Sequence, residues 1–347
     1  MSVQNTSLHV PTMAEMMAEG KTPDVLFWVG CAGSFDDRAK KITKAFVRIL
    51  NKLSYSFAVL GAEESCSGDP AKRAGNEFLF QMQAMMNIEV MNAYNVKRIV
   101  TTCPHCFNTI KNEYPELGGK FEVIHHTQLL QTLMDEGKLS VSGGAFKGKR
   151  ITFHDPCYLG RANDVYEAPR ELIQKLDAEL VEMKRCKSKG LCCGAGGAQM
   201  FKEPEKGDKD VNVERTEDAL EAKPNIIATG CPFCNTMMTD GIKNKEKEDD
   251  IAVMDIAEMI AQANDLFHAH FLCMHALYHL KNRYLQEKRY CLLIQSVRVE
   301  RHIFLEHASS AHEPPGHTLL DTPDPLAAYY LNPKHYFDTQ ESDITDM

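Results

Sequence analysis

Short apolar runs alternate with longer amphipathic segments through most of this chain, from about residue 23 to residue 264. The short runs are typical of buried strands in a parallel sheet, which are apolar on both faces. In the longer segments apolar residues recur every three or four positions, as in helices with one buried face. This alternation predicts an α/β fold in which parallel sheets are flanked by helices.

The order of predicted elements occurs twice, which indicates two tandem lobes of the same architecture. The predicted strands cover residues 25–30, 56–61, 96–102, 121–126, 150–156, 178–183 and 225–230. The predicted helices cover residues 36–53, 71–94, 107–114, 128–137, 169–176, 213–222 and 233–243. We place the first lobe at residues 23–148 and the second at residues 149–264, after an N-terminal extension of residues 1–22.

The cysteines repeat with the same order. The four matching pairs are Cys31 and Cys157, Cys66 and Cys192, Cys103 and Cys231, and Cys106 and Cys234. The first two pairs are 157 − 31 = 126 and 192 − 66 = 126 positions apart, and the last two are 231 − 103 = 128 and 234 − 106 = 128 positions apart. Ser67 stands where the second lobe has Cys193. The first lobe therefore offers four thiols and the second offers five, from an internal duplication.

The positions of these cysteines favour metal binding. Cys31, Cys103, Cys157 and Cys231 each follow a predicted strand, and the carboxyl ends of parallel strands form the ligand crevice of such sheets. Each Cys-Pro-x-Cys also opens a predicted helix, where proline suits the first turn and free N–H groups favour thiolate. The glycines after Cys193 (Gly194, Gly196 and Gly197) let the backbone pass close to a bulky inorganic core. We therefore expect a cysteine site at this edge of each sheet.

Composition and sequence patterns limit the expected cellular location of the protein and the kinds of partner that it binds. The 347 residues carry a formal charge of −9 without a sustained basic block, so nucleic acid is not an expected partner. The start of the chain has no secretory pattern, and no apolar run reaches the length of a membrane span. We expect a cytoplasmic protein, in which the twelve cysteines stay reduced, and membrane association only through a partner.

Motifs for binding a redox nucleotide are missing from the sequence. No Gly-x-Gly-x-x-Gly follows a predicted strand, and no complete Gly-x-x-x-x-Gly-Lys-Ser/Thr phosphate loop occurs. If the cysteine sites are redox centres, a flavin- or ferredoxin-type partner must therefore supply or remove their electrons.

The repeated Cys, Cys-Cys-Gly, Cys-Pro-x-Cys pattern resembles the cysteine-rich CCG domain family over residues 23–264. That family includes the catalytic chain of heterodisulfide reductases and the iron-sulfur subunits of bacterial lactate and glycolate oxidation systems. The resemblance implies a 4Fe-4S cluster, non-cubane in form, at the second site, where a substrate disulfide can be cleaved. Its implied ligands are Cys157, Cys192, Cys193, Cys231 and Cys234, with Cys192 and Cys193 as the candidates for cluster-based catalysis.

The first site departs from the family pattern at Ser67. Its implied ligands are Cys31, Cys66, Cys103 and Cys106. These four thiols suit a conventional 4Fe-4S cluster or zinc, and Ser67 could also serve as a weak oxygen ligand.

Three functions remain open from the sequence. The first is an oxidoreductase subunit that reduces a disulfide at the five-thiol site, as in heterodisulfide reductases. The second is pure electron transfer within a 2-hydroxy acid (lactate or glycolate) dehydrogenase complex. The third is a zinc-bearing structural or binding protein, which the fifth thiol disfavours because tetrahedral zinc takes four ligands.

Several other residues have two interpretations each. The pairs His125-His126 and His154-Asp155 lie near strand ends, where they could supply protons or simply form hydrogen bonds. Cys186, Cys273 and Cys291 lie outside the repeated motifs, and we interpret them as small apolar residues.

The C-terminal extension, residues 265–347, has no counterpart in the duplication. It holds nine of the fourteen histidines, and His275 and His279 have the spacing of one helix face. We predict a helix over residues 265–295 and a weakly ordered proline-rich end, and we do not interpret these histidines as metal ligands.

Overall fold

The computed structural model describes residues 8–141, 144–203, 206–287, 290–295 and 298–303, together with residue 331. The chain divides into two compact units. The first comprises Met1–Leu139 with Gly143–Ala263, and the second comprises Ser140–Ser142 with Asn264–Met347. Both cysteine repeats lie in the first unit.

The first repeat is built on a four-stranded parallel sheet of order β2-β1-β3-β4. Its strands are β1 (Val25–Trp28), β2 (Phe57–Ala58), β3 (Arg98–Thr101) and β4 (Glu122–His125). All four residues of β1 are buried, which explains why its sequence is apolar without alternation.

The second repeat has a sheet of the same order and direction, β6-β5-β7-β8. Its strands are β5 (Arg150–Phe153), β6 (Glu179–Leu180), β7 (Ile226–Thr229) and β8 (Ala252–Asp255). In both sheets the chain moves outward to one edge, returns to the centre and continues to the other edge. The two tandem α/β lobes expected from the sequence are thus confirmed.

Helices flank both sheets. The N-terminal extension contributes α1 (Met13–Ala18), and the helices of the first repeat are α2 (Gly30–Phe35), α3 (Ala39–Lys52), α4 (Asp69–Arg73), α5 (Glu77–Ala93), α6 (Pro104–Asn108) and α7 (His126–Asp135). The second repeat has α8 (Glu167–Gln174), α9 (Val211–Glu221), α10 (Pro232–Asn244) and the start of α11 (Ile256–Gln286). Short helical turns are η1 (Gly61–Glu63), η2 (Thr109–Glu113), η3 (Tyr114–Leu117), η4 (Lys187–Lys189) and η5 (Gln199–Phe201).

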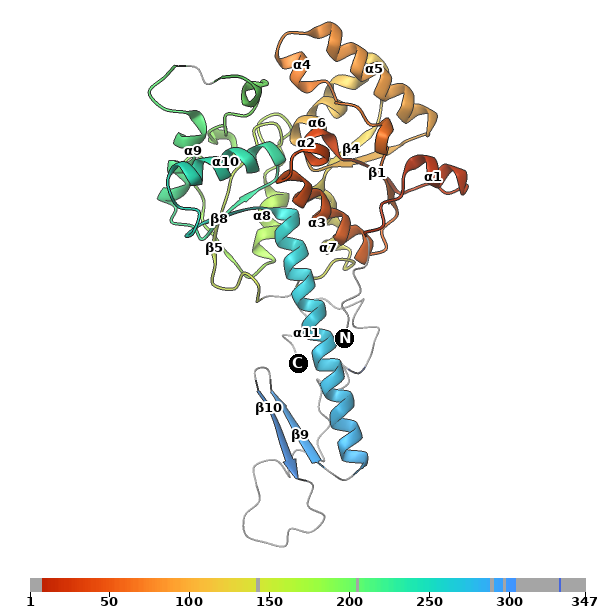
Figure 1. The fold of residues 1–347 in the computed structure, drawn as a ribbon, viewed down its shortest axis with the longest axis vertical. Helices are drawn as coiled ribbons and strands as arrows, with labels where there is room; N and C mark the ends of the chain where they lie inside the picture. Colours follow the sequence, from red (N-terminus) through yellow and green to blue (C-terminus); the bar gives the residue numbers. More distant parts are fainter. Residues whose placement is uncertain are drawn as a thin grey trace. The chain divides into compact units, whose positions relative to one another are not determined.

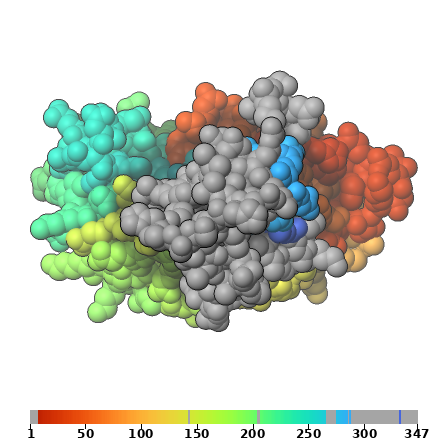
Figure 2. All heavy atoms as spheres, turned by 90° about the horizontal axis from the view of Figure 1, so that it is seen from below, coloured from red at the N-terminus to blue at the C-terminus, as the bar shows by residue number. Residues whose placement is uncertain are grey.

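The two repeats lie side by side, the first in red to yellow and the second in yellow-green to teal (Figure 1). The view from below shows the same division, with red side chains on one side and green to teal side chains on the other (Figure 2). Helix α3 contacts α10, and α7 contacts α8. Arg38 forms a two-point ion pair with Glu258 at 2.7 and 2.8 Å, which also ties the repeats together.

The duplication extends to the ends of equivalent helices. The N–H of His125 donates to the side chain of Gln128 at 3.0 Å, and the N–H of Asp255 donates to Glu258 at 2.9 Å. Both contacts close the turn between the last strand of a repeat and the helix after it, as in a capping box.

The predicted helix over residues 71–94 is wrong as a single element. Gly75, with φ of +87°, terminates α4, and the side chain of Asn76 caps α5 by accepting the N–H of Leu79 at 3.1 Å. A left-handed glycine followed by a capping asparagine breaks a helix even where the apolar pattern continues.

Two further differences concern the end of the second repeat. The hydrophobic pattern did not predict β8, because a partly exposed edge strand needs no continuous apolar run. The helix predicted over residues 265–295 is also wrong in its bounds, because α11 already begins at Ile256 and β9 (Tyr290–Gln295) pairs antiparallel with β10 (Arg298–Ile303). Most of the predicted proline-rich end lies outside the described residues.

Candidate metal centres

The nine motif cysteines lie in two groups at the carboxyl ends of the two sheets. Cys31 lies in the first turn of α2, directly after β1, and Cys157 follows β5. Cys103 and Cys231 are the residues just before α6 and α10, and each follows the third strand of its repeat in chain order. The ten cysteines whose side chains the structure describes are all free thiols.

The first group brings together four thiols. Cys31 interacts with Cys66, and Cys103 interacts with Cys106. The hydroxyl of Ser67 lies 3.5 Å from the sulfur of Cys106. Ser67 is thus inside the group at the place predicted from the duplication, although it does not offer a thiol.

The second group brings together five thiols. Cys192 contacts both Cys157 and Cys193, and Cys234 contacts Cys231. The sulfurs of Cys193 and Cys234 are 3.3 Å apart, so Cys193 occupies the position of Ser67 relative to the Cys-Pro-x-Cys motif.

Backbone N–H groups and neighbouring thiols favour thiolate at one or more cysteines of each group. Hydrogen bonding from Cys31 and from the N–H of Gly68 lowers the pKa of Cys66 to about 6, against the effect of burial. Burial raises the pKa of Cys231, but hydrogen bonds from Cys103, from Cys234 and from the first N–H groups of α10 outweigh it and lower the pKa to about 5. The pKa of Cys192 is also lowered, chiefly by Cys157 and Cys193, with the N–H of Gly194 at 3.3 Å adding to the effect.

Equivalent glycines shape both loops. Gly68 has φ of +88° and Gly194 has φ of +92°, a left-handed conformation that glycine adopts without steric cost. This conformation turns the N–H of each glycine back toward the sulfur of the cysteine two positions earlier.

The two groups touch each other. The thiol of Cys103 interacts with the thiol of Cys231. Beside this contact, the buried ring of His105 packs between Tyr158 and Phe233, with ring centres 4.8 and 5.4 Å away. Nδ1 of His105 lies 2.9 Å from Oδ2 of Asp69, and this hydrogen bond fixes the orientation of the ring.

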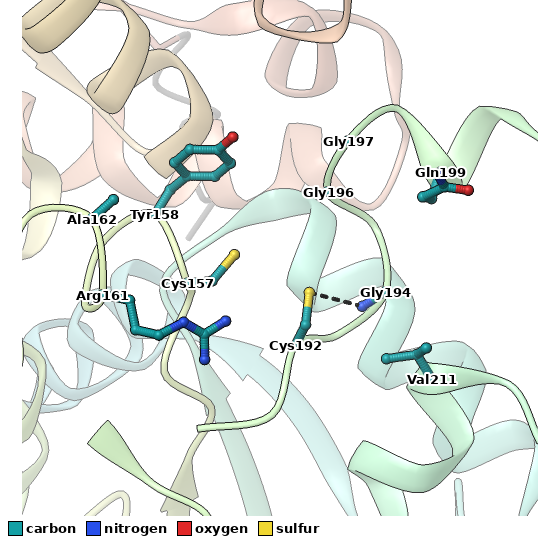
Figure 3. A pocket seen from close by; sticks show the side chains of 10 residues that line it. All are labelled: Cys157, Tyr158, Arg161, Ala162, Cys192, Gly194, Gly196, Gly197, Gln199 and Val211. Carbon is teal, nitrogen blue, oxygen red and sulfur yellow. Dashed lines mark hydrogen bonds between the residues drawn. The ribbon is translucent and has the colours of Figure 1, made fainter. Parts of the chain in front are cut away.

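A cavity of about 550 Å³ opens beside the second group. Figure 3 shows the sulfur atoms of Cys157 and Cys192 at its wall, with the side chains of Tyr158 and Arg161 nearby. A smaller cavity of about 280 Å³ reaches Cys31 and Cys66 of the first group. Each group therefore has thiols that a small molecule can approach and thiols that are fully buried.

The histidines near the strand ends are neutral and buried. Burial lowers the pKa of both His126 and His154 to about 3, and that of His125 lies well below its usual value for the same reason. Asp155 forms a two-point ion pair with Arg170 at 2.8 and 3.0 Å and accepts the N–H of Lys187. These contacts favour the structural interpretation of both pairs over proton transfer.

Several polar residues at the two groups were not predicted from the sequence. Glu64 accepts the N–H groups of Val29 and Gly30 at 3.0 and 2.6 Å, next to Cys31, and burial raises its pKa to about 7. Arg161 and Tyr158 line the larger cavity. The only indication in the sequence was that Glu64 lies close to Cys66 and that Tyr158 and Arg161 lie close to Cys157.

The donor set fits an iron-sulfur cluster in the second group. All five candidate ligands there are sulfurs, and backbone N–H groups face two of them. Cluster iron takes thiolate ligands, whereas tetrahedral zinc would leave one thiol unused. The first group, with four thiols and Ser67, fits a four-iron cluster or zinc equally well.

Comparison with known proteins agrees with this geometry. The family model described as a cysteine-rich domain, CCG, matches residues 25–111 and again residues 151–239. The chain belongs to the CCG family. Each match covers one of the two repeats, and each contains the cysteines of one group.

Curated relatives share both CCG repeats. The "Probable iron-sulfur-binding oxidoreductase FadF" of Bacillus subtilis is 48% identical over 255 residues, which are 73% of this chain and 36% of that protein. The "EtfAB:quinone oxidoreductase" of Syntrophomonas wolfei is 44% identical over 261 residues, 73% of this chain and 36% of that protein. One subunit of the "Dihydromethanophenazine:CoB--CoM heterodisulfide reductase" of Methanosarcina barkeri is 36% identical over 247 residues, 69% of this chain and 59% of that protein. The match to the first two relatives thus covers about a third of their length.

The part of the chain that follows the CCG repeats matches a different family model. A family model described as DNA-J related protein matches residues 242–347. In this part the rings of His275 and His279 pack at 4.5 Å, so the predicted shared helix face is confirmed. The side chains of Cys273 and Cys291 lie outside the described residues, and Cys186 is a half-buried free thiol. None of the helices in the described part of the chain has the length and apolar composition of a membrane span.

Proposed function

We propose that this chain is an iron-sulfur electron-transfer subunit of an oxidoreductase. The observation that carries the proposal is the meeting of nine thiols in two adjacent groups, joined at Cys103 and Cys231. A structural zinc protein needs no such contact between sites, whereas an electron carrier gains from closely spaced centres. The names of the relatives, which include an iron-sulfur-binding oxidoreductase and a heterodisulfide reductase, support the same function.

In this proposal the five-thiol group holds a 4Fe-4S cluster through Cys157, Cys192, Cys193, Cys231 and Cys234. The four-thiol group holds a second 4Fe-4S cluster or a zinc ion through Cys31, Cys66, Cys103 and Cys106. Bound clusters supply one-electron redox chemistry, and the chain's own groups stabilise the charge on the thiolates. The N–H groups of Gly68 and Gly194 are the clearest examples, because each faces a ligand sulfur.

Metal and sulfide analysis of protein purified without oxygen tests this proposal. We expect about eight irons and about eight acid-labile sulfides per chain, with redox-active electron paramagnetic resonance (EPR) signals. About four irons with one zinc would mean that the Ser67 group is structural and that the second group alone carries electrons. Zinc without sulfide would contradict the redox function.

A partner protein with its own redox cofactor completes the function. The match covers about a third of the first two relatives, and one of them is named for EtfAB and quinone. We propose a flavin- or ferredoxin-type partner, a cytoplasmic location in which the thiols stay reduced, and membrane contact only through that partner.

Helix α5 offers the docking face for that partner. One side of it holds the first group, because Asn87 bonds both the hydroxyl of Ser65 and the carbonyl of Cys66. The other side exposes large apolar residues at helical spacing: Phe78, Leu79, Met82, Met85 and Met86. An apolar stripe of this kind is typical of a protein interface.

Replacing two apolar residues of this stripe with glutamate tests whether the partner docks there. We expect Met82→Glu with Met86→Glu to slow electron transfer from reduced ferredoxin at least tenfold while leaving reduction by dithionite unchanged. Met17→Glu is the control, since Met17 is also an exposed methionine but lies on α1. Equal rates in both variants would place the docking face elsewhere.

A second candidate function is reduction of a disulfide at the five-thiol group. The cavity of about 550 Å³ favours it, because it brings a small molecule to the sulfurs of Cys157 and Cys192 beside the guanidinium of Arg161. Cleavage of one disulfide consumes two electrons and two protons and releases two thiols. Oxidation of the pre-reduced protein by a small disulfide, with two thiols released per two electrons lost, would support catalysis. Oxidation only by an added electron-accepting protein would support pure transfer, as in a lactate- or glycolate-type dehydrogenase complex.

A further inference from the structure

His154 is a buried histidine beside the five-thiol group that has one unused ring nitrogen. It directly follows β5 and is 1% exposed. One of its ring nitrogens lies within 4.8 Å of the sulfurs of Cys193 and Cys234. Nε2 has no hydrogen-bond partner among the described residues. A buried polar atom without a partner costs stability, so its presence next to a candidate metal centre points to a role there.

Arg215 determines which nitrogen of His154 carries the proton. The Nε of Arg215 donates to Nδ1 of His154 at 2.9 Å. A guanidinium has only donors, so Nδ1 must present its lone pair, and the proton of the neutral ring is on Nε2. Arg215 is itself buried and fixed by Asp218 and by the carbonyl of Arg185. The chain therefore presents Nε2–H, a donor, as the nitrogen available to the five-thiol group.

The first repeat has a similar group at the equivalent position. Trp28 and His154 are 154 − 28 = 126 positions apart, the same spacing as Cys31 and Cys157. The indole Nε1 of Trp28 is also buried and also has no partner among the described residues. The two repeats thus keep a buried ring N–H at the same place, although the side chains differ.

We propose that His154 donates an N–H···S hydrogen bond to a sulfur of the centre bound in the second group and thereby raises the reduction potential of that centre. This inference rests on the proposed iron-sulfur function. His154 is not a ligand in this arrangement, because iron would need the lone pair of Nε2 and the guanidinium of Arg215 excludes a proton from Nδ1. A hydrogen bond to sulfur stabilises the more negatively charged, reduced state, so it favours uptake of an electron.

Redox titration of anaerobically purified protein tests the effect of the donor. We expect His154→Leu to make reduction of the second centre about tenfold less favourable, which is about −59 mV for a one-electron couple. His154→Gln keeps an acceptor for Arg215 and an amide donor, and it should retain most of the wild-type potential. Trp28→Phe is the control in the other repeat and should leave the second centre unchanged. An equal shift in the Leu and Gln variants, or no shift in either, would overturn the proposal.

Pulsed EPR on the wild-type protein gives an answer even if these variants fold poorly. With ¹⁵N-labelled histidine we expect one weakly coupled nitrogen and one proton that exchanges in D₂O. A strongly coupled nitrogen would make His154 a ligand, and no coupled nitrogen would mean no contact; either result contradicts the inference. Iron and sulfide are measured first on the same sample. Their absence would count against the iron-sulfur function, whereas normal clusters without the histidine coupling would count only against the role of His154.

Discussion

The thiol of Cys103 interacts with the thiol of Cys231, so the two Cys-Pro-x-Cys motifs meet at their first cysteines. The two residues are equivalent in the duplication, and each directly precedes a helix at the carboxyl end of a strand. Because both are proposed ligands, the two centres would be in contact through ligand atoms. The pairing of the repeats thus serves the function as well as the fold.

This contact predicts two centres that influence each other. An electron added to one centre places negative charge near the other in a medium of low dielectric, so the second reduction should be less favourable. We expect the EPR spectrum of the fully reduced protein to be broadened or split relative to the sum of the separate signals. Cys31→Ser disturbs the first group away from the contact and should leave a simple spectrum from the second. A wild-type spectrum equal to the sum of two independent signals would contradict the coupling.

A reciprocal pair of substitutions tests the assignment of the fifth thiol. Ser67 lies 3.5 Å from the sulfur of Cys106, and Cys193 lies 3.3 Å from that of Cys234, so the two residues occupy matching places. Cys193→Ser should give the second group the ligand set of the first and change the EPR signal that the second cluster gives by itself. Ser67→Cys should give the first group five thiols and change the signal that the first cluster gives by itself. Unchanged spectra in Cys193→Ser would remove Cys193 from the ligand set.

The sequence predicted the grouping of the cysteines because their positions depend on strand ends and on a duplication. Cys31 and Cys157 follow strands that are buried on both faces, and such strands are visible as apolar runs. The parallel pairing then brings the cysteines to one edge without any further information. The spacing of the repeats alone predicted that Ser67 occupies the position that Cys193 has in the second repeat.

Other features depend on contacts between the repeats, which periodicity does not encode. Nothing in the sequence indicated that Cys103 touches Cys231, or that His105 packs between Tyr158 and Phe233. The role of His154 was also hidden, because it depends on Arg215 in a helix 61 positions away. The edge strand β8 was missed for a different reason, since its partly exposed residues lack a continuous apolar run.

The glycines in the two cysteine loops should respond unequally to substitution by alanine. Both have left-handed φ values, +88° for Gly68 and +92° for Gly194, which cost an alanine about 1–2 kcal/mol. A Cβ on Gly68 would also lie 2.7 Å from the ring of Phe80, whereas one on Gly194 would lie 3.2 Å from Val211. We therefore expect Gly68→Ala to lower the free energy of unfolding by about 1–3 kcal/mol more than Gly194→Ala.

Urea denaturation of the three variants Gly68→Ala, Gly194→Ala and Gly207→Ala measures this difference. Gly207 is the control, because a Cβ there meets nothing within 4 Å and its φ is not left-handed. An equal loss of stability at Gly68 and Gly194 would mean that Phe80 moves aside without cost.

The buried pair of His126 and Asp255 predicts how stability depends on pH. Nε2 of His126 lies 3.1 Å from Oδ1 of Asp255. Burial lowers the pKa of His126 from 6.5 to about 3 and raises that of Asp255 well above 3.8. Just above about pH 4 the folded pair therefore holds one proton, on Asp255. The unfolded pair also holds one, on the histidine, so the wild-type pair contributes no slope in this range.

Replacing either residue of the pair should make stability depend on pH, and the two variants should have slopes of opposite sign. In Asp255→Asn the folded state holds no proton and the unfolded histidine holds one, so stability should fall as pH drops from about 6.5 toward 3. In His126→Gln the folded Asp255 keeps a proton that the unfolded aspartate releases, so stability should fall as pH rises above about 3.8. Each slope approaches about 1.4 kcal/mol per pH unit. Urea denaturation at about pH 4.5, 5.5 and 6.5 measures both variants against the wild type, and slopes of the same sign would contradict the shared proton.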